Sequence, residues 1–160
     1  MNQKLLAVLI VLLIAGCLAP DVSEPTDNLI VENIESGTSV ALWDGKEGKR
    51  YEIQLACINE ANGAESQHVL ATNLEAADEI TFTPVEEIKA PVYPQTYALT
   101  AEVFVNLGDG PQSVNEAQLL AGQALLRKDA NRQNCPRLAA MKQAQQDAKD
   151  SRVGVWGNVK

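Results

Sequence analysis

Residues 28–58 read NLIVENIESGTSVALWDGKEGKRYEIQLACI, and this stretch decides the fold. β-Branched and apolar residues fill 28–34, 38–43 and 51–58, and short turn-rich segments with glycine separate the three runs. Runs of this length and composition, joined by tight connections, predict strands. The folded part of the chain is therefore expected to begin with three strands in succession.

The middle of the chain predicts a helix followed by two more strands. Apolar residues in 67–77 recur at helical spacing, 80–85 is β-branched, and 97–107 alternates as a long strand does. Prolines mark the connection between the last two runs.

The C-terminal third predicts two helices. Ser113 and Glu116 form a capping-box pattern ahead of a helix that should stop at Gly122. A last helix is expected from about Pro136, with Asn134 as its cap, to Gly154. Five strands, one helix between the third and fourth, and two helices at the end predict an α+β fold that is mainly a β barrel. The expected form is a five-stranded OB-fold barrel with three helices.

The first 16 residues have the pattern of a secretion signal. Lys4 supplies a positive charge, residues 5–14 are apolar, and the run LIAGC at 13–17 resembles the bacterial lipobox. In that motif the thiol, here that of Cys17, receives a diacylglycerol group and becomes the new N-terminus. Cleavage after Ala19, giving a soluble secreted protein, and an uncleaved anchor helix are the alternatives.

The expected organisation has three parts. Residues 1–16 form the lipoprotein signal peptide, and residues 17–27, with two prolines and three acidic residues, form a tether. Residues 28–160 form one domain. The predicted location is outside the cytoplasm, on a bacterial cell membrane through the lipid, with inner and outer membrane left open.

Charge argues against a nucleic-acid partner. The chain carries a net charge of −8, and residues 17–110 contain 17 acidic and 4 basic side chains. Residues 111–160 reverse this with 4 acidic and 8 basic side chains. The acidic part would repel a polyanion. The basic part is either a solvated helix face or a docking surface for an acidic partner.

Two segments near the C-terminus resemble the staphylococcal-nuclease (thermonuclease) family. NEAQLLAGQA at 115–124 is similar to the helix after the fifth strand of that family, and RVGVWG at 152–157 is similar to its closing G-x-W. The resemblance extends over about 29–157 and makes the domain staphylococcal-nuclease-like. It implies a calcium-dependent phosphodiesterase with two metal carboxylates, a glutamate that assists the attacking water, and two arginines on the phosphoryl group.

The chain departs from the family at each of those positions. The family pattern V-R-L-x-G-I-D-x-P-E appears as IQLACINEAN at 53–62, so the arginine is Gln54, the metal aspartate Asn59 and the glutamate Asn62. In the first hairpin D-G-D-T appears as ESGT, which leaves Gly37 in place of the second metal carboxylate. The second arginine falls at Ala98.

These departures predict an envelope lipoprotein whose degenerate, non-catalytic domain acts as a binding or scaffolding module, with no catalytic residue and no cofactor. Its partners would be the membrane, through the lipid, and an envelope protein or other ligand. The alternative is a divergent calcium-dependent nuclease in which relocated carboxylates hold the metal, and the candidates are Glu35, Glu60 and Glu65.

The remaining cysteines predict a disulfide. With Cys17 used by lipid, Cys57 and Cys135 are left in an exported, oxidising setting. The family resemblance places the end of the third strand near the start of the last helix, where these two residues lie. Two separately buried thiols are the alternative.

Overall fold

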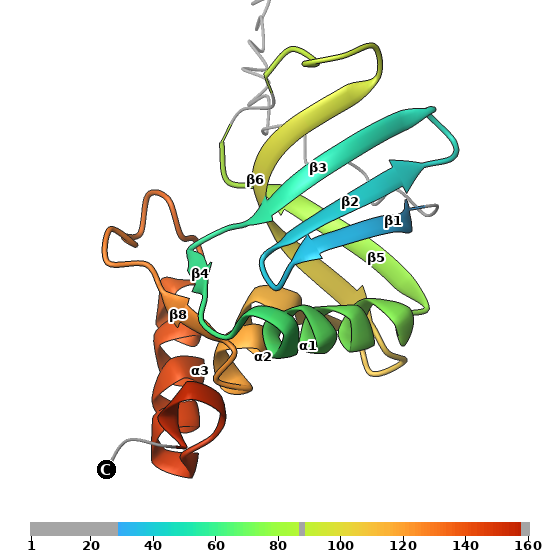
Figure 1. Cartoon of the computed structure of the whole chain (residues 1–160). Helices are drawn as coiled ribbons and strands as arrows, with labels where there is room; N and C mark the ends of the chain where they lie inside the picture. The colour runs from blue at the N-terminus through green and yellow to red at the C-terminus, as the bar shows by residue number, and fades with distance from the viewer. Residues whose placement is uncertain (1–28, 87–88, 158–160) are drawn as a thin grey trace, which may run out of the picture.

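The computed structural model describes residues 29–86 and 89–157 as an α+β fold with a mixed sheet and three α-helices (Figure 1). The signal and tether positions predicted at 1–27, Cys17 among them, lie outside the described residues. The strands are β1 Leu29–Ser36, β2 Ser39–Asp44, β3 Lys49–Leu55, β4 Ile58–Glu60, β5 Glu79–Pro84, β6 Thr96–Asn106, β7 Pro111–Ser113 and β8 Ala124–Leu126. The helices are α1 Gly63–Glu75, α2 Val114–Leu120, α3 Leu138–Ser151 and the short 3₁₀ turn η1 Gly154–Trp156.

The main sheet has the strand order β1-β2-β3-β6-β5, with β7 added to β6. All neighbours are antiparallel except β3 and β6, which are parallel because α1 and β5 intervene along the chain. β1 and β5, at the two ends of this order, approach each other. β4 and β8 form a separate two-stranded ladder beside the helices (Figure 1).

The hydrophobic core lies between the sheet and the helices. In β3, Tyr51, Ile53 and Leu55 are buried while Gln54 is exposed, which is the period of two expected of a strand with one covered face. Leu70 of α1 and Leu119 of α2 add buried apolar side chains to this core, whereas α3, with Met141, packs mainly against α2 and β8.

The strand expected over 51–58 is two strands. Cys57 has a φ of 71°, a left-handed backbone conformation that ends β3 and redirects the chain into β4. The last helix also differs from expectation, because it begins at Leu138 and Asn134 does not cap it. The Asn134 side chain instead accepts a hydrogen bond from the amide of Asn131 at 2.8 Å, inside the preceding loop.

The two segments similar to the nuclease family touch each other. The amide of Val155 donates to the carbonyl of Gly122 at 3.0 Å, and a Cβ placed on Gly122 would lie 2.3 Å from the carbonyl oxygen of Val153. The predicted stop at Gly122 is confirmed, with a φ of 66° that favours glycine. The predicted cap is confirmed too, since the Ser113 hydroxyl accepts from the amide of Glu116. No helix among the described residues is both long and apolar enough to span a bilayer.

Candidate functional site

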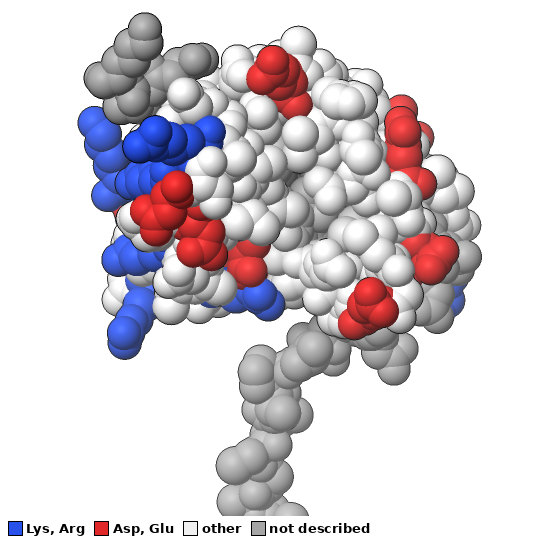
Figure 2. All heavy atoms as spheres, turned by 90° about the horizontal axis from the view of Figure 1, so that it is seen from below, with Lys and Arg blue, Asp and Glu red and all other residues white. Residues whose placement is uncertain are grey.

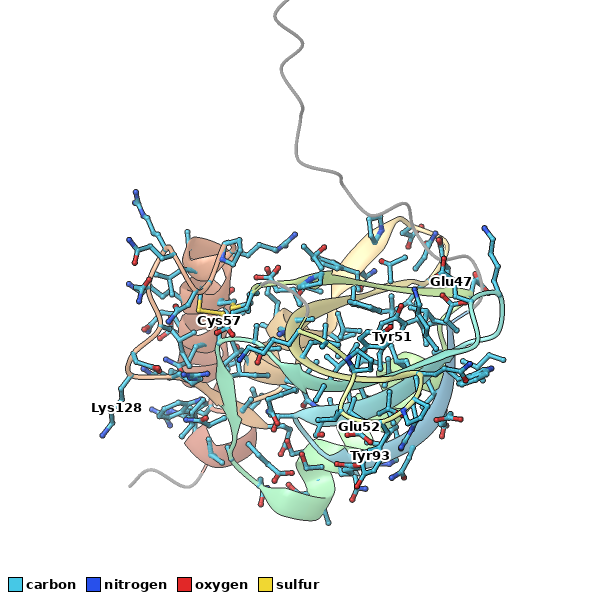
Figure 3. All side chains as sticks on the ribbon, turned by 90° about the horizontal axis from the view of Figure 1, so that it is seen from above. Glu47, Tyr51, Glu52, Cys57, Tyr93 and Lys128 are labelled. Carbon is cyan, nitrogen blue, oxygen red and sulfur yellow. A yellow bond between two sulfur atoms is a disulfide. The ribbon has the colours of Figure 1, made fainter. Side chains whose placement is uncertain are left out.

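A hollow of about 380 Å³ opens on the outer face of β3 and β6. Its walls come from four places: the β1–β2 hairpin, β3, β6 and the connection between β5 and β6. Figure 3 shows Glu52, one of its residues, on the sheet side of the molecule, away from Cys57. The lining residues are Glu35, Ser39, Glu52, Gln54, Glu86, Lys89, Ala98, Leu99 and Thr100.

The strand register brings the two positions matched to arginine into this hollow. Gln54 lies opposite Thr100 and Ala98 lies opposite Glu52 in the parallel pairing of β3 with β6. Residues two apart on a strand share a face, so Gln54 and Ala98 both point out of the sheet beside each other. The two positions matched to arginine are therefore neighbours in the structure, and neither of their side chains carries a charge.

Gly37, the position matched to a metal carboxylate, is packed against α1. A Cβ on Gly37 would lie 1.9 Å from the Ser66 hydroxyl and 2.7 Å from the Ser66 backbone carbonyl carbon, distances at which atoms overlap. The Ser66 hydroxyl is itself fixed, because it donates to the carbonyl of Gln123 at 2.8 Å. An aspartate cannot occupy position 37 unless α1 moves.

Polar contacts hold the backbone of Gly37 from both sides. Its amide donates to the Glu60 carboxylate at 2.7 Å, and its carbonyl accepts from the buried side-chain amide of Gln118 at 2.8 Å. The same Gln118 group also donates to the carbonyl of Ser66 at 2.9 Å. The hairpin turn, α1 and α2 are thus joined at Gly37.

The two asparagines lie apart from the hollow. Asn59 is exposed in β4, opposite Leu125 of β8. Asn62 immediately precedes α1, and its side-chain amide donates to the Glu65 carboxylate. Neither residue lines the hollow that contains Gln54 and Ala98.

The three carboxylates considered as substitutes have different neighbours. Glu35 accepts a hydrogen bond of 3.4 Å from Ser39, Glu60 accepts from the amide of Gly37, and Glu65 accepts from Asn62. Within residues 29–86 and 89–157, no three His, Cys, Asp or Glu side chains are grouped so that they could hold a metal ion. Only Glu35 of the three lines the hollow.

Three buried polar residues outside the hollow were not predicted from the sequence. Asn115 joins β3 to β6, since its side chain accepts from the amide of Val103 at 3.0 Å and donates to the carbonyl of Ala56 at 2.9 Å. Gln118 holds the hairpin, and Glu102 lies buried beside the amide of Arg137. Burial raises the pKa of Glu102, and the hydrogen bond from Arg137 opposes that rise. Asn115 falls inside the family-like segment, which is the one signal that could have drawn attention to it.

The predicted disulfide between Cys57 and Cys135 is confirmed. Their Cα atoms are 5.8 Å apart, and the bridge spans 78 residues of sequence. Both side chains are buried, and Figure 3 shows the bond between the end of β3 and the segment that leads into α3.

Charged side chains are distributed unevenly over the molecule. Figure 2 shows lysine and arginine gathered mainly on the side where α3 lies, with acidic side chains over the rest of that face. Two arginines from the C-terminal part of the chain are paired with acids: Arg137 with Glu116 at 2.6 Å, and Arg127 with Asp129. The residues that line the hollow all fall within the acidic part of the chain, residues 17–110.

The chain matches no protein-family model, and no curated protein matches it.

Proposed function

We propose that this chain is a lipid-anchored envelope protein whose OB-type, staphylococcal-nuclease-like domain binds a ligand or partner and does not hydrolyse nucleic acid. The lipobox-like run before Cys17 supports the anchor. The hollow on β3 and β6 supports a binding role.

The strand arrangement supports an OB-type barrel. The order β1-β2-β3-β6-β5, the parallel pair β3 and β6, and the approach of β1 to β5 are the relations that a five-stranded OB barrel requires. Ligands of such barrels bind on the face of the second and third strands, between the first hairpin and the loop before the last strand. The hollow is lined by Glu35 and Ser39, on the two strands of the first hairpin, and by Glu86 and Lys89 of the connection before the last strand.

The proposal against catalysis rests above all on Gly37. The family needs a metal carboxylate at the matched position, and here the space for any side chain is taken by Ser66. Losing one electrostatic stabiliser typically costs about 10²–10³ in rate, and a positioned acid or base contributes about 10²–10⁴. The neutral residues at Gln54, Asn59, Asn62 and Ala98 remove several such contributions together.

A cleavage assay tests this function. The full chain, purified in a non-ionic detergent, should leave DNA and RNA intact in millimolar calcium. A mock purification from the same host without the chain measures contaminating nuclease. Calcium-dependent cleavage that co-purifies with the chain and disappears in Glu35→Gln or Glu60→Gln would establish the divergent nuclease in place of the binding module.

Metabolic labelling with a fatty acid tests the anchor. We expect label on the wild-type chain and none on Cys17→Ser, because the Cys17 sulfur is the acceptor of the lipid. Equal labelling of the two chains would rule out lipidation at this residue. Mass analysis of the N-terminus separates cleavage after Ala19 from an uncleaved leader.

A further inference from the structure

Acidic side chains surround the hollow on β3 and β6. Glu35 comes from the end of β1, Glu52 from β3 and Glu86 from the connection after β5. Among the described residues that line it, Lys89 is the one basic residue. Three elements far apart in the sequence thus bring negative charge to a single concavity.

Two of these carboxylates still have lone pairs available to accept hydrogen bonds from a ligand. Glu52 is engaged by the Arg50 guanidinium at 2.9 Å, and Arg50 also pairs with Glu32 at 2.9 Å. Among the described residues no ion pair joins Glu35 or Glu86 to a cation, and both are exposed. A carboxylate offers about four lone-pair sites, and the 3.4 Å contact from Ser39 occupies one of those on Glu35.

The floor of the hollow carries no charge and leaves space for a ligand. Ala98 presents only a methyl group, while Gln54 and Thr100, opposite each other in register, offer an amide and a hydroxyl. At about 380 Å³ the hollow falls within the range of about 300–1,000 Å³ typical of small-ligand pockets. A neutral floor with hydrogen-bonding groups and acidic walls suits a ligand that carries a positive charge.

We propose that this hollow binds an organic cation, a primary ammonium or guanidinium group, carried by a free amine or by a basic side chain of a peptide. The inference rests on the proposed function, since it gives the binding module its ligand chemistry. The carboxylates attract the cation, and charge-assisted hydrogen bonds to Glu35 and Glu86 hold its N–H donors. The same walls repel the phosphates that arginines at positions 54 and 98 would have attracted.

The test is a titration of the full chain, in non-ionic detergent, followed by amide NMR. The probes are spermidine, a capped tripeptide with a central lysine, and the same tripeptide with a central glutamine. We expect saturable shifts at Gln54, Ala98 and Thr100 with at least one cationic probe and none with the glutamine tripeptide. Shifts with spermidine alone identify a free amine as the ligand type, and shifts with the lysine tripeptide identify a peptide side chain.

Charge variants make the test specific. Exposed carboxylates each contribute up to about fivefold in affinity, so Glu35→Gln with Glu86→Gln should weaken binding roughly tenfold. Lys89→Gln should tighten it, because a competing cation is removed. Glu75→Gln, on the exposed side of α1, is the matched control and should change nothing.

Three results would overturn the inference: no saturable shifts with either cation, equal binding of the glutamine tripeptide, or an affinity that the double variant leaves unchanged. The titration contains neither calcium nor nucleic acid. Its failure is therefore separate from failure of the proposed function, which the cleavage assay reports.

Discussion

At the scale of one residue, Gly37 is a packing position. Its missing side chain lets the β1–β2 hairpin rest on Ser66, while Glu60 and Gln118 hold its amide and carbonyl. A carboxylate introduced there would not by itself create a metal site, because the new side chain would have to displace α1. The neutral residues at 54, 59, 62 and 98 lack this steric block.

Gly37→Ala should lower the free energy of unfolding by about 1–3 kcal/mol, the usual cost of forcing a methyl group into a filled space. Gly45→Ala is the matched control, since its Cβ would have no neighbour nearer than the Trp43 indole nitrogen at 3.9 Å. That change should stay within about 0.5 kcal/mol. Urea unfolding measures both, and equal losses in the two variants would contradict the packing described for Gly37.

Glu102 should make stability depend on pH. Burial raises its pKa in the folded protein above the ordinary value of 4.5, so the folded state binds the proton more readily than the unfolded state. Its contribution to stability is therefore fully present below about pH 4 and is lost as pH rises through the raised pKa. Glu102→Gln removes this loss of stability at higher pH. The side-chain carbonyl of the glutamine can still accept the hydrogen bond from the Arg137 amide.

The variant should accordingly gain stability relative to wild type between about pH 4 and pH 7. Urea unfolding of both chains across this range measures the difference, with Glu75→Gln as an exposed control. A difference that does not change with pH would show that Glu102 is not titrating in a buried site.

At the scale of elements, the disulfide joins the end of β3 to the segment before α3. Closing a loop of 78 residues stabilises by about 4.5 kcal/mol in the chain-entropy model. Cys57→Ala with Cys135→Ala should lower the free energy of unfolding by about 2–5 kcal/mol. Cys17→Ser should leave it unchanged, and a double variant within about 1 kcal/mol of wild type would contradict a stabilising bridge.

The main elements were predictable because each carries a local pattern. The β-branched and apolar run of β2, the alternation of β3 and the cap of α2 at Ser113 can each be recognised from neighbouring residues. β4 and β8 were not predictable, because three-residue strands have no periodicity and their pairing joins residues more than 60 positions apart. The left-handed conformation of Cys57, which separates β3 from β4, has its one signal in the glycine that the quoted family pattern carries at that position.

The candidate site was predictable in part, because some of its positions lie in segments with a recognisable local sequence pattern. Matching to the family identified Gly37, Gln54 and Ala98, and the register places Gln54 and Ala98 beside each other. The sequence could not show that Ser66 fills the space at Gly37 or that Glu86 faces the same hollow as Glu35. Both facts depend on contacts between segments that are distant along the chain.

At the scale of the whole molecule, charge and fold separate the chain into two parts. Residues 17–110 carry 17 of the 21 acidic side chains, and residues 111–160, which include α3, carry 8 of the 13 lysines and arginines. A domain held near a membrane by its N-terminus would present an acidic sheet face with a hollow to other envelope components. This distribution fits a cationic ligand better than a polyanionic substrate.

The most direct test of the proposal that this domain is nuclease-like but has no calcium site is a calcium titration followed by amide NMR. The resonances of Gly37, Asn59 and Glu60 should not shift saturably up to millimolar calcium, because Ser66 fills the space at Gly37 and Glu60 accepts the hydrogen bond of the Gly37 amide. Saturable shifts at these three residues that disappear in Glu60→Gln would contradict this account and establish a relocated calcium site.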